Sequence, residues 1–354
     1  MRPWENYIRD VVPYVPGEQP QGDGIIKLNT NENPYPPAPG VLKALKEMDG
    51  EQFRKYPDPS SNVLVEELAK IHGLEKNQIF VGVGSDDVLG MAFLTFFNSK
   101  KPVLFPDVTY SFYPVWARLF GIPYETIPVD EGFQIRMEDY GGRENGGIIF
   151  PNPNAPTGIA LAAGQVEWIA KANPNVVVIV DEAYIDFGGH SARFLLDRLD
   201  NLLVVRTFSK SRSMAGMRIG YAMGSETLIK ALQNVKYAYN SYTMNMPSII
   251  LGTEALKDQT YFEDTVARIV LTRESTAIKL RELGFSFPKS SANFLFVTHE
   301  KAPAKELFCA LREAGIYVRY FPEPRLKDHL RVTIGTEEEM EVLVRFLTSY
   351  LKKI

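Results

Sequence analysis

The most constraining feature of the sequence is a series of short, almost wholly apolar segments that alternate with segments of helical spacing. Residues 102–106, 147–150 and 176–180 are examples of the apolar segments. Strands with almost no polar residues are buried on both faces, which is typical of a parallel sheet covered by helices. The alternation therefore predicts an α/β fold, and ligands bind such folds beyond the carboxyl ends of the parallel strands.

The pattern changes after about residue 240. Long helical patterns at residues 247–256 and 261–283 precede a mixture of strand and helix patterns in the last part of the chain. A chain of 354 residues has the length for two domains. We expect a large domain over residues 41–243, built on a mostly parallel, helix-covered sheet, and a smaller α+β domain over residues 244–354.

The first 40 residues are rich in proline, glycine and asparagine. Proline interrupts regular helices and asparagine favours turns, so this segment is not a helix. We expect an extended N-terminal arm over residues 1–40 that lies on other parts of the molecule. Apolar residues such as Tyr14, Ile26 and Leu28 argue against a disordered tail.

Charge and composition exclude several classes of function. The net charge of −4 and the pI of about 5.8 give no electrostatic footprint for nucleic acid or for an anionic membrane. The sequence has no long uncharged apolar run that would span a membrane. The one cysteine, Cys309, permits no disulfide within the chain, so we expect a cytoplasmic protein in which Cys309 is a buried structural thiol.

The histidines do not form a metal-binding pattern. His72, His190, His299 and His329 are far apart, and none pairs with another at the spacing that metal ligands adopt. We therefore predict no metal site, and we expect each histidine at the surface or in a loop.

A glycine-containing loop at residues 82–87 joins a predicted strand to a predicted helix. Its glycines, including Gly84, would let the backbone approach an anion, and the helix start offers free N–H groups near Ser85 and Asp86. The loop is a candidate phosphate site. A plain turn with Ser85 or Asp86 as the helix cap is an alternative. A dinucleotide fingerprint is another, although the third glycine is missing and the loop comes late in the chain.

Three other predicted strand ends carry polar side chains. Tyr110 follows residues 102–106 and could stack on a flat ring or belong to the core. Asp181 and Glu182 directly follow residues 176–180, where an acid is costly unless it has a cationic partner such as a protonated pyridine nitrogen; a salt bridge or a helix cap is the alternative. Lys210 follows another apolar segment and is either a desolvated nucleophile or a solvated surface lysine.

Each of these signals is weak by itself, but together they are specific. A phosphate site, a stacking aromatic, a carboxylate and an amine are all expected at strand ends of one sheet. These are the parts that hold an electron-sink cofactor and use it.

With these loops in place, the sequence resembles the aspartate-aminotransferase superfamily of pyridoxal-phosphate enzymes over nearly its whole length. The resemblance rests on the order and spacing of residues 28–34 (LNTNENP), 54–58 (RKYPD), 82–87 (GVGSDD), 152–158 (NPNAPTG), 181–184 (DEAY), 209–210 (SK), 215–218 (AGMR) and 330–336 (LRVTIGT). Within the superfamily the set is most similar to the branch that acts on histidinol phosphate.

The resemblance implies roles for the cofactor-binding residues. Lys210 would form the Schiff base with pyridoxal phosphate and later move the proton between substrate and cofactor. Asp181 would keep the pyridine nitrogen protonated, Tyr110 would stack on the ring, and Tyr184 would hydrogen-bond the phenolic oxygen. The phosphate would be held by Gly84, by the backbone and side chains of Ser85 and Asp86, by Ser209 and Arg218, and by Tyr56 from a neighbouring subunit. A homodimer is therefore implied.

The sequence departs from the family pattern at one position of the cofactor site. The family usually has asparagine directly before Pro-Thr-Gly, where its side chain bonds the phenolic oxygen, and this chain has Ala155 there. Either Asn154 substitutes for it, or Tyr184 holds that oxygen alone.

The implied reaction is a ping-pong transamination. L-Histidinol phosphate would donate the amino group and 2-oxoglutarate would accept it, with both substrate anions bound by Arg331, helped by Arg319, Tyr14 and Asn31. An aromatic-amino-acid aminotransferase and a decarboxylase of a phosphorylated amino acid remain alternatives with the same cofactor. A nicotinamide-dependent dehydrogenase would leave Lys210 without a role, and a non-catalytic sensor domain would have no use for Lys210 and Asp181.

Overall fold

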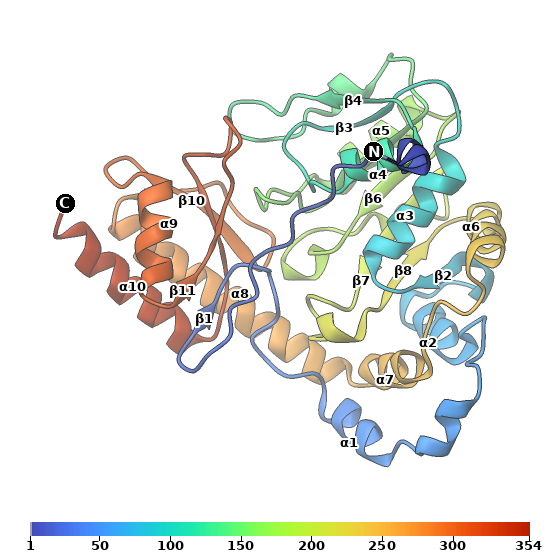
Figure 1. Cartoon of the computed structure of the whole chain (residues 1–354), viewed down its shortest axis with the longest axis horizontal. Helices are drawn as coiled ribbons and strands as arrows, with labels where there is room; N and C mark the ends of the chain where they lie inside the picture. The colour runs from blue at the N-terminus through green and yellow to red at the C-terminus, as the bar shows by residue number, and fades with distance from the viewer. Residues whose placement is uncertain (1) are drawn as a thin grey trace.

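The computed structural model describes residues 2–354. Its large sheet has seven strands in the order β2-β8-β7-β6-β5-β3-β4 (Figure 1). The strands are β2 (Ile79–Gly82), β3 (Val103–Pro106), β4 (Tyr124–Ile127), β5 (Gly147–Pro151), β6 (Val178–Asp181), β7 (Leu202–Thr207) and β8 (Gly220–Met223). Strand β8 runs opposite to the other strands, so the carboxyl ends of those strands share one edge of the sheet. The prediction of a mostly parallel sheet is confirmed.

Helices cover both faces of this sheet. On β6, Val178 and Val180 pack into one apolar cluster and Ile179 into another, which is why the strand has no polar face. The first cluster lies under α2 (Asn62–His72), α5 (Ala163–Ala172) and α7 (Met246–Lys257), and the second under α3 (Ser85–Phe96), α4 (Tyr113–Phe120) and α6 (Glu226–Tyr239). Burial on both faces is what the apolar segments of the sequence predict.

The last third of the chain forms a smaller α+β unit. Its antiparallel sheet has the order β12-β13-β10-β9 and consists of β9 (Phe285–Ser286), β10 (Phe294–His299), β12 (Arg319–Tyr320) and β13 (Leu330–Thr333). The helices are α8 (Gln259–Glu282), α9 (Ala304–Glu313) and α10 (Glu337–Leu351). The long helix α8 runs from the large unit to the small one (Figure 1). This architecture also agrees with the prediction.

The domain boundary itself remains a proposal. Helix α7 lies beyond the expected boundary at residue 243, yet it packs closely against α2 and against α1 (Pro39–Glu47) of the large unit. Ile249 and Leu256 of α7 belong to the same apolar cluster as Leu64 of α2. We propose that the large unit extends through α7 and that the passage to the small unit lies in α8.

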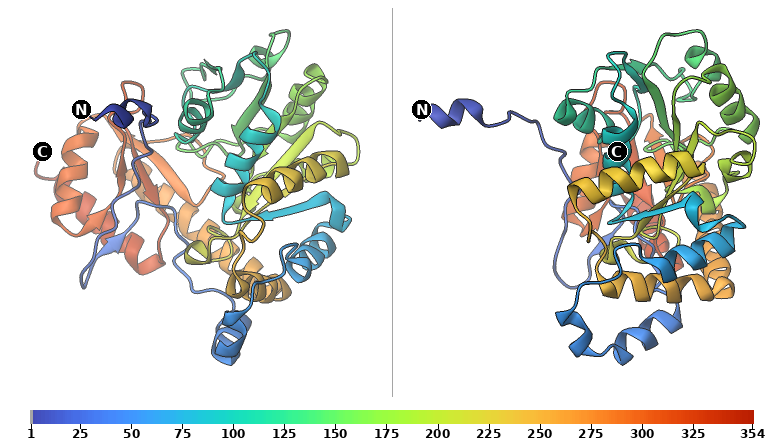
Figure 2. Two further views of the ribbon diagram at one scale, coloured as in Figure 1. Left: turned by 45° about the vertical axis from the view of Figure 1, so that its right-hand side comes forward. Right: turned by 90° about the vertical axis from the view of Figure 1, so that its right-hand side faces the viewer.

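Much of the segment before α1 has no regular secondary structure, and part of it pairs with the small unit. Strand β1 (Ile26–Lys27) pairs in parallel with β11 (Ile316–Tyr317), and the next residue, Leu28, is buried. The arm begins with a short helix, η1 (Pro3–Tyr7), which stands clear of the body of the chain in Figure 2, whereas Tyr14 and Val15 contact the body. The other short 3-10 helices are η2 (Gly50–Arg54), η3 (Lys76–Gln78), η4 (Met137–Tyr140), η5 (Ile185–Phe187), η6 (Ala192–Leu195) and η7 (Ala215–Met217).

Two expectations from the sequence are wrong. Cys309 is exposed, because the buried face of α9 carries Leu307 and Leu311, and a residue two positions from each of them points to the other side of the helix. His72 is buried, and its Nε2 lies 2.9 Å from the hydroxyl of Tyr221. Burial, followed by nearby arginines, lowers the pKa of His72 to about 3, so this histidine is a neutral part of the core.

Residues 2–354 contain no helix with the length and apolarity needed to cross a membrane.

Candidate active site

The polar loops predicted at separate strand ends meet in one pocket. Its lining from the large unit includes Ser85, Asp86, Tyr110, Asp181, Tyr184, Ser209, Lys210 and Arg218, its lining from the small unit is Arg319 and Arg331, and the arm adds Tyr14, Asn29, Thr30, Asn31 and Glu32. The strands that carry these loops end at the same sheet edge, which explains why residues so distant in sequence come together.

Lys210 lies at the centre of this pocket with its amine largely withdrawn from water. Its Nζ donates a hydrogen bond to the carbonyl oxygen of Thr30 at 2.9 Å. Burial, and then the positive charge of Arg331, lower the pKa of Lys210 to about 8, although Glu32 and Asp86 oppose the shift. A larger share of this amine is therefore neutral near pH 7 than in an exposed lysine, and a neutral amine is the nucleophilic form.

Asp181 ends strand β6 and faces the same pocket. It is only 4% exposed, and it accepts hydrogen bonds from the hydroxyl of Tyr113 and the backbone N–H of Ala183, each at 3.2 Å. Burial raises the pKa of Asp181 to about 7, and the Tyr113 bond offsets only part of that rise. No ion pair within residues 2–354 includes Asp181. A buried carboxyl group without a cation is an incomplete arrangement, which a protonated ring nitrogen would complete.

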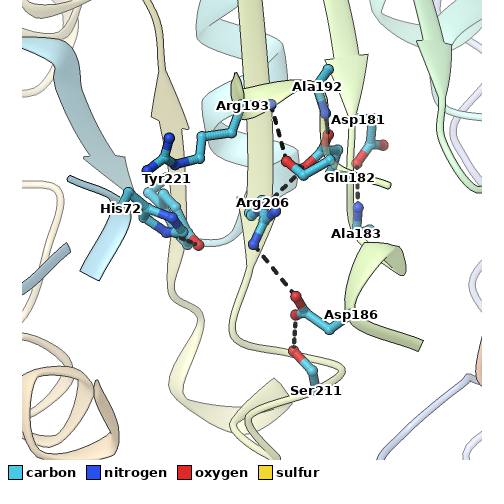
Figure 3. A network of polar contacts seen from close by, with 11 residues as sticks. His72, Asp181, Glu182, Ala183, Asp186, Ala192, Arg193, Arg206, Ser211 and Tyr221 are labelled. Atoms are coloured by element: carbon cyan, nitrogen blue, oxygen red, sulfur yellow. Dashed lines mark hydrogen bonds and ion pairs between the residues drawn. The ribbon is translucent and has the colours of Figure 1, made fainter. Parts of the chain in front are cut away.

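Glu182, the next residue, has the opposite environment (Figure 3). Its side chain is fully buried and pairs with the guanidinium of Arg206, with 2.9 Å between Glu182 Oε2 and Arg206 Nε. It also accepts hydrogen bonds from the hydroxyl of Ser191 at 2.7 Å and from the backbone N–H of Ala192 at 2.6 Å. Both oxygens of this carboxylate are bonded within the protein and its charge is paired with Arg206, so Glu182 is a structural acid.

The same network connects the loops that carry Asp181 and Lys210. Arg206 also contacts Asp186 at 3.4 Å, and Asp186 accepts a hydrogen bond from the hydroxyl of Ser211 at 2.6 Å (Figure 3). Asp186 lies on the chain that follows Asp181, and Ser211 directly follows Lys210. The buried arginine therefore holds the two loops in a fixed relation behind the pocket.

The glycine loop forms the start of α3 and is shaped to receive an anion. Gly84 is the N-cap residue with φ +87°, and no side chain caps the helix. A Cβ at Gly84 would lie 2.5 Å from a guanidinium nitrogen of Arg218, so only glycine lets Arg218 approach the helix start this closely. Ser209 also lines the pocket there. A helix N-terminus, hydroxyls and an arginine together suit a phosphate group.

Asp86 takes part in this arrangement differently from what the resemblance implies. Its carboxylate accepts a hydrogen bond from the hydroxyl of Tyr110 at 2.8 Å and pairs with Arg218 at 3.2 Å. The carboxylate thus orients two neighbours of the anion site, and only its backbone N–H at the helix start suits an anion.

The arm and the aromatic residues after β3 form one wall of the pocket. The ring of Tyr14 stacks on Phe112, with 4.2 Å between the centroids, and lies 6.3 Å from the ring of Tyr110. Tyr110 and Tyr14 both line the pocket, so a flat molecule there would meet an aromatic surface.

The small unit supplies the cations on the other side. One guanidinium nitrogen of Arg331 donates to the carbonyl oxygen of Asn29 at 2.9 Å, while its Nε is buried and has no partner within residues 2–354. Arg319 donates to the carbonyl oxygen of Val15 at 3.3 Å and also lines the pocket. A buried donor without a partner fits an anionic substrate group.

Ala155 and Asn154 differ in their position relative to the pocket. Ala155 lines the pocket, whereas Asn154 does not and instead donates to the carbonyl oxygen of Val108 at 2.9 Å. Of the two alternatives for the missing asparagine side chain, this arrangement favours Tyr184 alone, because Asn154 does not line the pocket and donates to Val108.

Tyr56 does not belong to the pocket of its own chain. It is 82% exposed and stacks on Tyr242, with 4.6 Å between the ring centroids.

Sequence reasoning missed several contributions to the site. The carbonyl oxygens of Asn29 and Thr30 hold Arg331 and Lys210, and a backbone group leaves no mark on the side-chain pattern. Tyr113, which donates to Asp181, is the first residue of α4 and could have been found as the second tyrosine after β3, three residues beyond Tyr110.

Comparisons with known proteins agree with this geometry. The family model described as "Aminotransferase class I and II" matches residues 23–347. The chain is 50% identical to histidinol-phosphate aminotransferase 1 of Hydrogenovibrio crunogenus, covering 99% of this chain and 98% of that protein. It is also 50% identical to histidinol-phosphate aminotransferase 1 of Methylococcus capsulatus, covering 98% and 96%. The solved structure of histidinol-phosphate aminotransferase from Sinorhizobium meliloti in complex with pyridoxal-5'-phosphate is similar, with a TM-score of 0.84, 25% identity, and coverage of 93% and 91%.

Proposed function

The chain belongs to the class I and II aminotransferases, and on that premise we propose that it transfers the amino group of L-histidinol phosphate to 2-oxoglutarate, giving imidazole-acetol phosphate and L-glutamate. Relatives that cover nearly the whole chain at 50% identity carry the name of that activity. The observation that carries the proposal is the pocket itself, in which the Lys210 amine and the Asp181 carboxyl group face two arginines, Arg319 and Arg331.

Pyridoxal phosphate is the cofactor that fits this pocket. The uncapped start of α3 at Ser85, with Ser209 and Arg218, suits the phosphate. Asp181 would stay ionised against a protonated ring nitrogen, while Tyr110 would lie against the ring and Tyr184 would bond the phenolic oxygen. When bound, pyridoxal phosphate withdraws electrons from the bond between hydrogen and the carbon that carries the amino group.

The side chains of the pocket would then perform the proton transfers. The Nζ of Lys210 would take the proton from the carbon that carries the amino group and would give it to a carbon of the bound cofactor. Its lowered pKa of about 8 suits this exchange near neutral pH, because an amine of ordinary pKa would hold its proton too tightly. Asp181 is placed to keep the electron demand high, and Glu182 is not, since its oxygens are already used.

The arginines would select the substrates. Histidinol phosphate carries a phosphate ester where an amino acid has its carboxylate, so one cationic site must accept both anions, and a guanidinium can do so with two hydrogen bonds. Arg331 supplies the main site, helped by Arg319, Tyr14 and Asn31, which also line the pocket. Replacement of Arg319 by alanine should raise the KM for histidinol phosphate. Unchanged kinetics with that substrate would remove Arg319 from the site.

A homodimer would complete the pocket with Tyr56 of a second subunit. Tyr56 is exposed in the single chain and is not part of its own pocket lining, and the arm before β1 carries the exposed apolar residues Trp4, Tyr7 and Val12. Such side chains are typical of a surface that another chain covers. Mixing Lys210→Ala subunits with Tyr56→Ala subunits should restore activity, because one site in each mixed dimer has both residues. Mixed dimers without activity would contradict the crossing.

We also propose a cytoplasmic location. The one cysteine of the chain, Cys309, allows no internal disulfide, which suits a reducing compartment.

The decisive test of the reaction is a panel of amino donors with 2-oxoglutarate as acceptor. The kcat/KM should be highest for histidinol phosphate. A clear preference for phenylalanine or tyrosine would replace the proposal by an aromatic-amino-acid aminotransferase. Release of carbon dioxide from a phosphorylated amino acid, without consumption of 2-oxoglutarate, would replace it by a decarboxylase.

A further inference from the structure

Asn31 of the arm is fixed more firmly than its place in an extended segment suggests. It is 1% exposed and has φ +57°, a left-handed conformation that asparagine tolerates better than most residues. Its backbone N–H donates to Thr333 Oγ1 at 3.0 Å, and its carbonyl oxygen accepts from Asn293 Nδ2 at 3.0 Å. Both partners are buried residues of the small unit.

The side chain of Asn31 forms a second pair of bonds. Its Oδ1 accepts from Thr333 Oγ1 at 3.0 Å, and its Nδ2 lies 3.0 Å from the hydroxyl oxygen of Tyr184. The residue therefore connects the small unit directly to a pocket residue of the large unit.

The hydrogen bonds from Thr333 to Tyr184 run in one direction. Thr333 Oγ1 accepts the backbone N–H of Asn31 with one lone pair and gives its single proton to Asn31 Oδ1. The oxygen of the amide thus faces Thr333, and the amide nitrogen faces Tyr184. An amide nitrogen only donates, so the hydroxyl oxygen of Tyr184 accepts.

The proton of the Tyr184 hydroxyl must therefore point elsewhere. In the part of the chain that the structure describes, this hydroxyl has no bond besides the one from Asn31, and Tyr184 lines the pocket with Lys210 and Asp181. Ala155 lies on the same wall and has no polar side-chain atom to offer. The open direction for the Tyr184 proton is into the pocket.

We infer that Asn31 is a positioning residue, held by Thr333, which directs the hydroxyl proton of Tyr184 at the phenolic oxygen of the bound cofactor and so makes up for the missing asparagine at Ala155. The inference rests on the proposed cofactor. It gives the segment of residues 29–31 a common task, because Asn29 holds Arg331, Thr30 holds Lys210 and Asn31 holds Tyr184.

The consequence is visible in how the bound cofactor titrates. A proton directed at the phenolic oxygen stabilises negative charge there, and this lowers the proton affinity of the nitrogen that Lys210 contributes to the same conjugated system. The charged groups that act on Tyr184 are Arg331, Lys210, Asp181 and Asp86. Loss of the Asn31 donor should therefore raise the pH midpoint of the cofactor's visible absorption band.

The test replaces Asn31 by aspartate, which keeps the shape and tolerates the backbone conformation but only accepts hydrogen bonds. Tyr184 would then turn its proton to Asp at position 31 and away from the pocket. In the holoenzyme, Asn31→Asp should raise the pH midpoint of the visible band by about one unit or more. The new negative charge also acts through space, so the same change is made in a Tyr184→Phe background, where only the through-space effect survives.

The outcome is decided by the two shifts. A shift in the Tyr184→Phe background that is less than half of the shift beside Tyr184 supports the positioning role. Equal shifts in the two backgrounds overturn it, because the hydroxyl would then not be involved.

A second pair of variants serves if Asn31→Asp does not fold. Thr333→Val removes the hydroxyl that fixes the Asn31 amide and should raise the midpoint part of the way, whereas Thr333→Ser keeps the hydroxyl and should restore the wild-type value. Identical midpoints for Thr333→Val and the wild type would also overturn the inference. If the wild-type protein gives no visible band that borohydride removes, the proposed cofactor has failed instead, so the two failures are distinguishable.

Discussion

Asp181 and Glu182 are adjacent in sequence and both buried, yet they lie in two different regions of the molecule. Glu182 belongs to the network behind the sheet edge, where Arg206, Ser191 and the backbone of Ala192 satisfy it. Asp181 belongs to the pocket, where a tyrosine hydroxyl and a backbone N–H contact it and no cation among residues 2–354 pairs with it.

The difference between the two acids shows how a buried acid that serves a ligand can be distinguished from one that serves the fold. Burial raises the pKa of both carboxyl groups, but only Glu182 has a guanidinium to oppose the rise. A buried carboxylate that is paired with a cation of the protein itself serves the fold. A buried acid that the protein has left without a cation is arranged for a ligand that brings one.

The largest expected effect tests the pocket side of this comparison. Asp181→Asn keeps the shape but removes the charge that a protonated ring nitrogen needs. The kcat/KM for transamination should fall about a thousandfold, as for other losses of a fixed charge at a reacting centre. The thermal midpoint of the cofactor-free protein should not fall, because the uncompensated acid is gone. A kcat/KM within tenfold of the wild-type value would contradict the assignment of Asp181 to the ring nitrogen of the cofactor.

Glu182→Gln tests the structural side. The change leaves Arg206 buried with only Asp186 to balance it, at 3.4 Å. The free energy of unfolding in urea should drop by about 3 kcal/mol, the lower end for breaking a buried pair. Protein that remains folded should still bind the cofactor and show its visible band. If Glu182→Gln had the stability of the wild type but had lost the visible band of the cofactor, then Glu182 and not Asp181 would be the acid that serves the cofactor.

A pH series sharpens the comparison in the cofactor-free protein. The pKa of Asp181 is raised by burial from 3.8 to about 7 in the folded state. Between those values the native state holds a proton that the unfolded state has lost, so the contribution of Asp181 to stability is complete below pH 4 and is lost as the pH rises to about 7. The slope is at most about 1.4 kcal/mol per pH unit.

The measurement is the difference in unfolding free energy between the wild type and Asp181→Asn across that range. The difference should move in favour of the variant as the pH rises from about 4 to about 7. A difference that stays constant with pH would show that Asp181 is ionised throughout and has a partner after all.

The smallest expected effect concerns the one side chain that supports Asp181. Tyr113→Phe removes a hydrogen bond of 3.2 Å and leaves the ring in place. It should lower kcat/KM by roughly tenfold, since a hydrogen bond to a charged group is worth about 1.5 kcal/mol. Trp116, also on α4, offers a matched control as Trp116→Phe, because the structure gives its ring aromatic contacts and no bond to Asp181.

Much of the fold and part of the site could be predicted from the sequence. Apolar strand segments predicted a sheet buried on both faces, and the rule that parallel strands end at one edge then brought Ser85, Tyr110, Asp181 and Lys210 together. The near absence of polar residues in these segments carries this information, because a wholly apolar strand has few stable environments other than a sheet covered on both faces.

The rest was hidden because it depends on backbone groups or on side-chain direction. Nothing in the sequence shows that the carbonyl oxygen of Thr30 meets Lys210, or that the amide of Asn31 donates to Tyr184. The outward direction of Cys309 and the burial of His72 likewise depend on how helices pack. The sequence leaves open whether Asn154 or Tyr184 alone takes the place of the missing asparagine, and the bond from Asn154 to Val108 is visible only in the structure.

The most direct test of the central claim is to reduce the cofactor-loaded protein with borohydride and to map the modified peptide by mass spectrometry. The account predicts that the visible band disappears and that the phosphopyridoxyl group is found on Lys210. The Asp181→Asn variant should carry the same label with an altered band, and Lys210→Ala should carry none. A label on another lysine, or no label on the wild-type protein, would contradict the assignment of this pocket.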